Sequence, residues 1–263
     1  MKKSGNIENK IIPLAFTAIL VVLWTVVVEN GMVERFILPS PIDIVIVLAD
    51  MFPDVLEHLA ITLKEAFLGF GAAVIFSLII ALLMDNVIII RKAVYPLLVV
   101  SQTIPTIALA PLFAVWFGLG LLPKVIVVFL VCFFPIVVSL VDGLDSVDTD
   151  LLNLFKTMGA KKVQIFRYLK LPASMVNFFS GLRIAATYSI MGAVIAEWLG
   201  GEKGIGIYML RVKHSYALDK MFAAVLLIVI LSLGLFKAIS LLENVTMPWY
   251  KLFKDNNSGG KNL

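Results

Sequence analysis

The amino-acid sequence predicts an all-α membrane protein with six transmembrane helices and a long cytoplasmic loop. Its 263 residues are 60% hydrophobic and 15% charged, and their mean hydropathy is +1.00. Soluble domains are about one quarter charged and at most about half apolar, and disordered chains are poorer still in apolar residues. The apolar runs are also continuous, and longer than the roughly ten-residue alternating segments of a transmembrane β-barrel. A polytopic helical membrane protein is the class that remains.

Six stretches reach the length of about 20 apolar residues that a spanning helix needs. They are residues 11–28, 66–84, 93–117, 125–141, 173–196 and 221–242. No small-residue cleavage site follows the first stretch, so we interpret it as a retained span and not as a signal peptide. The third contains Pro96, Pro105 and Pro111, which predict breaks near both of its ends. Arg183 is the single charge inside the fifth stretch.

The distribution of basic residues predicts that both termini are cytoplasmic. Of the 22 Lys and Arg residues, fourteen lie on the side of the termini, seven lie on the opposite side and Arg183 lies within a span. An excess of Lys and Arg marks cytoplasmic loops. The prediction makes residues 1–10 a cytoplasmic N-terminal segment and residues 243–263 a cytoplasmic tail. Residues 142–172 become a cytoplasmic loop inside a membrane domain that covers residues 11–242.

The outer segment 29–65 is too long for a simple connection. Its apolar residues recur at helical spacing and predict a helix lying along the outer surface. These residues are Ile44, Val47, Leu48, Met51 and Val55. Glu197 follows the fifth span, and we expect it at the outer interface beside Trp198, since Trp is enriched there. Close packing between helices is expected at four small residues, Gly69, Gly71, Ala72 and Ala73.

Residue patterns that would support catalysis or metal binding are missing from the sequence. It contains no G-x-x-x-x-G-K-[ST] phosphate loop, no H-E-x-x-H and no G-x-S-x-G. Cys132 is the one cysteine, and the two histidines lie far apart. The glycines at 201, 204 and 206 follow a membrane helix and not a strand, so a dinucleotide site is not expected there. We expect no catalytic residue, no metal, no cofactor and, at a net charge of +4, no nucleic-acid partner.

The cytoplasmic loop predicts a short amphipathic helix, a glycine turn and a second amphipathic stretch. Asp145 or Asp148 can cap the first helix. Apolar residues then recur at steps of three and four, at Leu151, Leu154, Phe155 and Met158. Gly159 stands where a helix can end in the left-handed conformation, and residues 161–170 form the second stretch. The apolar face of the first helix needs a partner, either in its own bundle or in a groove of another protein.

This loop resembles the cytoplasmic signature of the inner-membrane permease subunits of binding-protein-dependent ABC importers. The signature reads Glu-Ala-Ala, three residues, Gly, nine residues, Ile-x-Leu-Pro. Gly159 followed after nine residues by LKLP (169–172) matches its second half. The sequence departs from the first half, because NLF (153–155) stands where Glu-Ala-Ala is typical, while the helix and the hinge are kept.

Other motifs follow in an order typical of one branch of that family and cover nearly the whole chain. They are SQTIPT (101–106), PL (111–112), WFGLG (116–120), FPI (134–136), GLR (181–183) and AEW (196–198). The branch imports nitrate, sulfonates, taurine and thiamine-type pyrimidines or related heterocycles. GLRIAATYS (181–189) and GGEKG (200–204) are most similar to its pyrimidine or vitamin-precursor members.

The resemblance implies a permease subunit of an ABC importer, multi-pass in the bacterial inner membrane and not itself an enzyme. Its solute would be a thiamine-type pyrimidine or vitamin precursor, or an anion such as nitrate, a sulfonate or taurine. Its partners would be two cytoplasmic ATP-binding subunits, an external binding protein, membrane lipid and a second permease subunit, expected to be identical. A channel or secondary transporter without an ATPase is one alternative, which the loop projection disfavours. A lipid-modifying membrane enzyme is the other, disfavoured because paired catalytic groups are missing.

The site residues that follow fall into two sets. Coupling to the ATPase is expected at Leu151, Asn153, Leu154, Phe155, Met158, Gly159, Leu171 and Pro172, where the alternative is a surface helix that stabilises the bundle. The translocation path is expected at Gln102, Thr103, Thr106 and Arg183. The three polar residues could instead form hydrogen bonds between helices. Arg183 could meet an anionic solute, or could be a charge near the cytoplasmic end bonded to carbonyls or to a neighbouring loop.

The predicted orientation can be tested by labelling single introduced cysteines from outside intact cells. We expect Asp43→Cys to react, because the outer segment is exposed, and Lys3→Cys and Asn256→Cys to remain unlabelled. Labelling of either terminal position would contradict cytoplasmic termini.

Overall fold

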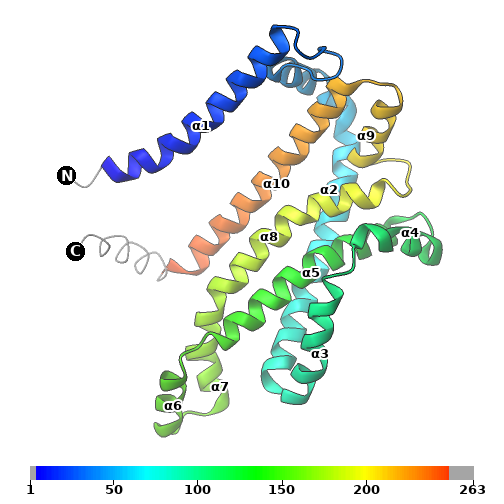
Figure 1. Cartoon of the computed structure of the whole chain (residues 1–263). Coiled ribbons are helices and arrows are strands. Elements are labelled where there is room, and N and C mark those ends of the chain that lie inside the picture. Colours follow the sequence, from blue (N-terminus) through cyan, green and yellow to red (C-terminus); the bar gives the residue numbers. More distant parts are fainter. Residues whose placement is uncertain (1–3, 249–263) are drawn as a thin grey trace.

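The computed structural model describes residues 4–248, with side chains from residue 11, and this part of the chain is helical without a strand (Figure 1). The elements are α1 Ser4–Glu29, α2 Pro41–Asn86, α3 Ile88–Ser101, α4 Thr106–Phe117, α5 Leu121–Asp145, α6 Thr149–Thr157, α7 Lys162–Ile165, the π-helical turn η1 Phe166–Lys170, α8 Leu171–Glu197, α9 Ile205–His214 and α10 Leu218–Thr246. Parts of the predicted N-terminal segment and tail, residues 1–3 and 249–263, lie outside this range.

The predicted fold class is confirmed. Five of the described helices are long and apolar enough to cross a membrane, and the bent pair α3 and α4 makes a sixth crossing if it counts as one. Helix α5 lies at the centre with α2 and α8 packed against it, and its inward side chains Val128, Cys132, Ile136 and Val137 are fully buried. Helices α6 and α7 project at one end of the molecule, and α9 lies at the other (Figure 1).

Helix α2 is a single hydrogen-bonded helix of 46 residues, so the helix predicted in the outer segment is continuous with the second span. The predicted apolar face does exist: Ile44, Met51 and Val55 are buried against residues of α9 and α10. The helix begins at a capping box in which Ser40 and Asp43 bond each other's backbone N–H. A helix of this length rises about 69 Å, more than twice the roughly 30 Å of a hydrocarbon core. Part of α2 therefore projects beyond the membrane.

The third predicted span is two helices, and its predicted breaks near both ends are wrong. Helices α3 and α4 meet at residues 102–105 with a bend of 100°. Pro105 directly precedes α4 as its N-cap, whereas Pro96 and Pro111 lie inside helices. Pro105 has no N–H to continue the α3 ladder, and it also restricts the backbone of the residue before it. Two prolines are thus accommodated and one turns the chain.

Helix α8 follows η1 directly, so the second predicted stretch of the loop, residues 161–170, and the fifth span form one continuous helical rod. Pro172 stands at the first turn of α8 and cannot donate a backbone hydrogen bond. A π turn is one of the local adjustments by which a helix passes such a missing donor. The loop of residues 142–172 therefore connects rigidly to α8.

Close helix packing depends on one of the two glycines that the sequence offered for it in α2. A Cβ on Gly69 would lie 2.5 Å from the Cβ of Val128 on α5, which is shorter than any real contact. A Cβ on Gly71 would meet nothing within 4 Å. Gly69 thus sets the separation of α2 and α5, and Gly71 does not take part.

Gly69→Ala should lower the thermal stability of the purified subunit, because overpacking a tight contact costs about 1–3 kcal/mol. Gly71→Ala provides a matched control on the same helix, and should leave stability unchanged or raise it, since Ala favours a helix by about 0.5–1 kcal/mol over Gly. The measurement is the unfolding midpoint of both variants in the same detergent. Equal midpoints for the two variants would show that α5 can shift away from α2 at no cost in stability, so that Gly69 does not set their separation.

Candidate functional site

Helix α6 presents an apolar row to solvent. Its first turn is capped by Asp148, whose carboxylate accepts a hydrogen bond from the N–H of Asp150 at 2.8 Å. Leu151, Leu154 and Met158 are 44%, 51% and 76% exposed. These three side chains stand one turn apart along one side of the helix. An exposed apolar row in a loop outside the spans favours contact with another protein.

The four residues of the predicted apolar face of this helix are not equally exposed. Phe155 lies one turn from Leu151 on the same face but is half-buried, as is Leu152. Asn153 is exposed. Phe155 is therefore less accessible to a partner than the three exposed residues.

Gly159 ends α6 in a left-handed conformation with φ of +76°. Its N–H donates to the carbonyl of Lys156, and the N–H of Ala160 donates to the carbonyl of Phe155, both at 3.0 Å. These two bonds form a Schellman motif, which satisfies carbonyls that the helix end would leave free. A side chain at this position would meet nothing within 4 Å, so the requirement for Gly comes from the backbone and not from space.

Two ion pairs hold the base of the projection to the membrane helices. Lys170 of η1 donates to Asp85 at the end of α2 at 2.5 Å. Arg91 of α3 pairs with Asp145 at the end of α5. Leu171 is exposed and Pro172 is half-buried where α8 begins. The loop is therefore fixed at its base, while the row on α6 remains free for contact.

The three polar residues of the predicted path lie together at the α3–α4 bend. Gln102 and Thr103 are exposed and Thr106 is half-buried. The Thr103 hydroxyl donates to the carbonyl of Val100 at 2.7 Å, within its own turn and not to another helix. Irregular backbone at membrane depth is tolerated where it is buried in protein or lines a water-filled cavity. The bend thus presents polar groups to the protein or water that lies next to it.

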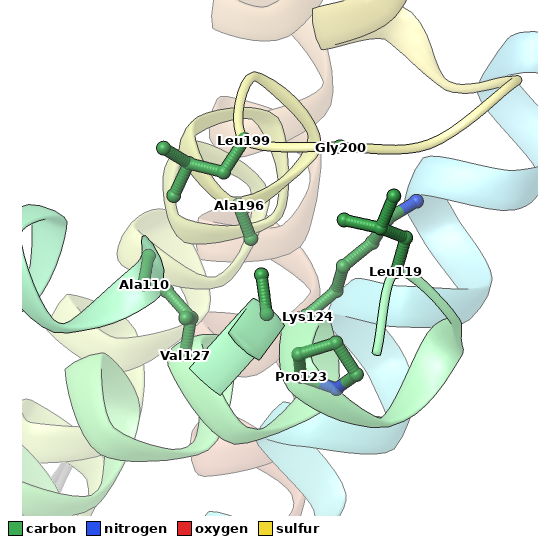
Figure 2. Close-up of a pocket in the computed structure, with 9 residues that line it drawn as sticks. Ala110, Leu119, Pro123, Lys124, Val127, Ala196, Leu199 and Gly200 are labelled. Carbon is green, nitrogen blue, oxygen red and sulfur yellow. The ribbon is translucent and has the colours of Figure 1, made fainter. Parts of the chain in front are cut away.

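A shallow hollow opens beside α4, α5 and the loop after α8 (Figure 2). It is lined by Ala110, Ala114, Leu119, Pro123, Lys124, Val127, Ala196, Leu199 and Gly200. The hollow has room for about one water molecule. It is too small for an organic solute, since ligand pockets measure about 300–1,000 Å³.

Arg183 is neutralised inside the chain. Its guanidinium pairs with Glu243 near the end of α10 and donates to the hydroxyl of Ser180 at 2.9 Å. Both charged side chains are mostly buried, at 22% and 15% exposure. These partners come from α8 and α10, and none of them from the α3–α4 bend. Arg183 and the three polar residues of the bend therefore do not form one group.

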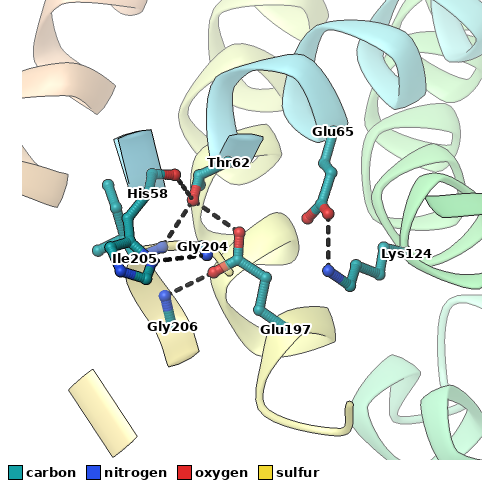
Figure 3. A network of polar contacts seen from close by, with 8 residues as sticks. All are labelled: His58, Thr62, Glu65, Lys124, Glu197, Gly204, Ile205 and Gly206. Carbon is teal, nitrogen blue, oxygen red and sulfur yellow. Dashed lines mark hydrogen bonds and ion pairs between the residues drawn. The ribbon is translucent and has the colours of Figure 1, made fainter. Parts of the chain in front are cut away.

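A buried polar network occupies the opposite end of the molecule, between α2, α5, α8 and the start of α9 (Figure 3). Lys124 Nζ lies 2.8 Å from Glu65 Oε1, and the two side chains are only 8% and 2% exposed. Glu197, 0% exposed, accepts hydrogen bonds from the Thr62 hydroxyl at 2.6 Å and from the Gly206 N–H at 2.5 Å. The network places buried charges where three helices meet.

The same network holds the first turn of α9. The N–H of Ile205 donates to Thr62 Oγ1, and the N–H of Gly204 donates to His58 Nδ1, each at 2.9 Å. The opening N–H groups of a helix have no partner within the helix and carry a partial positive charge. Glu197, Thr62 and His58 supply the missing acceptors.

The comparison with known families decides the identity of the chain. The family described as "Binding-protein-dependent transport system inner membrane component" matches residues 73–245. The chain belongs to this family.

Relatives agree with that membership, and a solved structure agrees with the fold. The formylaminopyrimidine transport permease protein ThiX of Halalkalibacterium halodurans is 39% identical over 241 residues, covering 91% of this chain and 96% of ThiX. The putative aliphatic sulfonates transport permease protein SsuC of Bacillus subtilis is 26% identical, covering 94% and 89%. A crystal structure of an amino acid ABC transporter aligns with a TM-score of 0.61 at 19% identity, over 74% of this chain and 95% of that one.

Membership confirms the central functional prediction. The chain is a permease subunit of an ABC importer in the inner membrane, of the branch that includes nitrate, sulfonate and taurine systems. It works with an ATPase and a binding protein, and ATP hydrolysis belongs to the partner subunits and not to this chain.

The network at the α9 end is the part that sequence reasoning missed. Glu65 and Lys124 directly precede the second and fourth predicted spans, and Glu197 is predicted at the outer interface. Glu197 does stand at the end of α8, but the structure buries it completely, which the sequence did not indicate. A signal was present in the glycines at 201, 204 and 206. A Cβ added at any of these glycines would overlap Lys124 Nζ or the Glu197 carboxyl group.

Proposed function

We propose that this permease imports an aminopyrimidine-type vitamin precursor, as one of two identical permease subunits served by two cytoplasmic ATPase subunits. The α6 end would face the cytoplasm and the ATPase, and the α9 end would face the binding protein outside. Support for this orientation comes from the fourteen-to-seven distribution of basic residues.

The observation that carries the coupling role is the exposed row on α6. Leu151, Leu154 and Met158 have no apolar cover among the described residues, and Gly159 fixes the direction in which they point. A groove on the ATPase would cover the row. Asn153, Phe155, Leu171 and Pro172 would support the projection, Phe155 from its half-buried side and the other two at the base. Motion of α6 would then pass into α8, because no loop separates η1 from α8.

We place the translocation path along the α3–α4 bend. Gln102, Thr103 and Thr106 offer polar groups there, and a second copy of the chain facing the bend would enclose them. Arg183 would stand at the cytoplasmic end of the path, held by Glu243.

The choice of solute rests on the relatives and on Arg183. The relative named for formylaminopyrimidine shares 39% of its residues over nearly the whole length, against 26% for the one named for sulfonates. An anion carrier needs a cation available to its solute, and the Arg183 guanidinium already has a carboxylate partner. An uncharged heterocycle fits this arrangement better than an anion.

Gly159→Val should uncouple the transporter without preventing insertion. A β-branched residue in the left-handed region is strained by about 1–2 kcal/mol, so the angle after α6 should change while every span is untouched. We expect the ATPase to co-purify poorly, or to hydrolyse ATP without moving solute, in reconstituted vesicles. Leu154→Asp should act in the same way, by placing a charge in the apolar contact.

Two conservative variants serve as controls for the coupling experiment. Gly159→Asn keeps a residue that tolerates the left-handed conformation, and Leu154→Met keeps the row apolar. Both should retain coupled transport. Normal docking and transport in Gly159→Val and Leu154→Asp would show that the projection is scaffold only.

The solute and the path can be tested in one uptake assay with the complete transporter. Labelled formylaminopyrimidine should be taken up, and taurine should not. Gln102→Leu should reduce uptake about tenfold, the equivalent of one lost hydrogen bond of about 1.4 kcal/mol. Val99→Leu, an exposed apolar position on α3, is the control. Uptake of taurine would contradict the proposed solute. Unchanged uptake by Gln102→Leu would show that Gln102 does not line the path and has a packing role.

A further inference from the structure

The carboxyl groups of Glu65 and Glu197 form a buried pair that the transport role does not explain. Glu65 comes from the middle of α2 and Glu197 is the last residue of α8, and both are at most 2% exposed. The Glu197 carboxyl group accepts a hydrogen bond from Thr62, which lies three residues before Glu65 on the same face of α2, so the two carboxyl groups belong to one network (Figure 3). Like charges this close, out of water, are strongly unfavourable if both groups are ionised.

One oxygen of this pair has no hydrogen-bond partner. Glu65 Oε1 accepts from Lys124, and both oxygens of Glu197 accept hydrogen bonds from fixed donors. Glu65 Oε2 is buried and receives none among the described residues. A buried carboxylate oxygen without a donor is costly. A proton on this oxygen would turn it into a donor toward Glu197.

The charges around the pair leave room for one more positive charge. Lys124 from α5 is the cation that contacts it, against two carboxyl groups. His58 of α2 accepts a hydrogen bond at Nδ1 from the Gly204 N–H, so its ring carries no proton on that nitrogen and is neutral. Lys203 is exposed and pairs with Glu57, and Arg211 of α9 donates to the Glu202 carbonyl. With one bound proton the buried cluster is electrically neutral.

The loop between α8 and α9 is shaped around these side chains. A Cβ on Gly201 would lie 2.8 Å from Lys124 Nζ, and a Cβ on Gly206 would lie 2.9 Å from Glu197 Oε2. Gly204, at φ of +134°, would overlap the Glu197 carboxyl group. Three glycines thus leave space for the charged groups and close the cluster against water. A loop fitted this closely indicates a built site.

We propose that Glu65 and Glu197 form a proton-binding site, in which one proton on Glu65 Oε2 is shared with the Glu197 carboxylate. This inference goes beyond the proposed function, and it does not depend on which solute is carried. The bound proton joins α2 to α8, and Glu197 in turn holds the first turn of α9. Loss of the proton leaves two adjacent negative charges that Lys124 alone balances, and weakens the hold on α9.

The test is infrared spectroscopy of the purified transporter in lipid nanodiscs at neutral pH. A protonated carboxyl group has a C=O absorption separate from that of carboxylates and shifts in D₂O. We expect such a band, equivalent to one proton per permease subunit, in the unmodified protein. It should be lost in Glu65→Gln, which has no carboxyl proton to carry. It should also be lost in Glu197→Gln, because Glu65 is then left with Lys124 as its counter-ion.

Glu57→Gln is the matched control, since Glu57 lies two turns from Glu65 on α2 but is exposed and paired with Lys203. It should leave the band unchanged. The unmodified protein alone can overturn the proposal, even if a Gln variant does not assemble. Absence of a protonated-carboxyl band at neutral pH would do so, and so would a band that persists in both Gln variants.

Discussion

The hydrocarbon of a membrane offers no hydrogen-bond partner to a peptide group, and this constraint governs most of the structure. It makes the described chain helical from Ser4 onward and confines irregular backbone to a few positions. At each of these positions the chain supplies its own solution. The π turn passes the missing donor of Pro172, the Schellman motif closes α6, and Glu197, Thr62 and His58 accept from the start of α9.

Sequence reasoning recovered the features that depend on composition and local spacing. Continuous apolar runs gave the membrane class, and a glycine after an amphipathic turn gave the left-handed end of α6. It failed where a tertiary partner decides the outcome. Three prolines in residues 93–117 look alike in sequence, yet only Pro105 turns the chain. Glu197 looks like an interfacial charge until α2 and α9 surround it, because burial is a property of the assembled helices and not of the neighbouring residues.

The two ends of the molecule for which we propose functions are joined by one continuous helix. From Lys162 to Glu197 the chain is helical without a break, with the α6 projection attached at one end and the polar network at the other. A rod of 36 residues is about 54 Å long. Displacement of the projection can therefore reach the start of α9 without passing through a flexible segment. Gly159 lies just outside this rod, at the joint where α6 meets it.

The buried pair of Glu65 and Lys124 also has a consequence for biogenesis. The two residues are 59 positions apart, and Glu65 leaves the ribosome first. At synthesis rates of about 5–20 residues per second, its partner follows about 3–12 seconds later. During that interval α2 carries a carboxyl group whose burial is unfavourable, so it stays in contact with water or keeps its proton. The helix settles against α5 only after Lys124 arrives, and the ion pair thereby sets an order of assembly on the nascent chain.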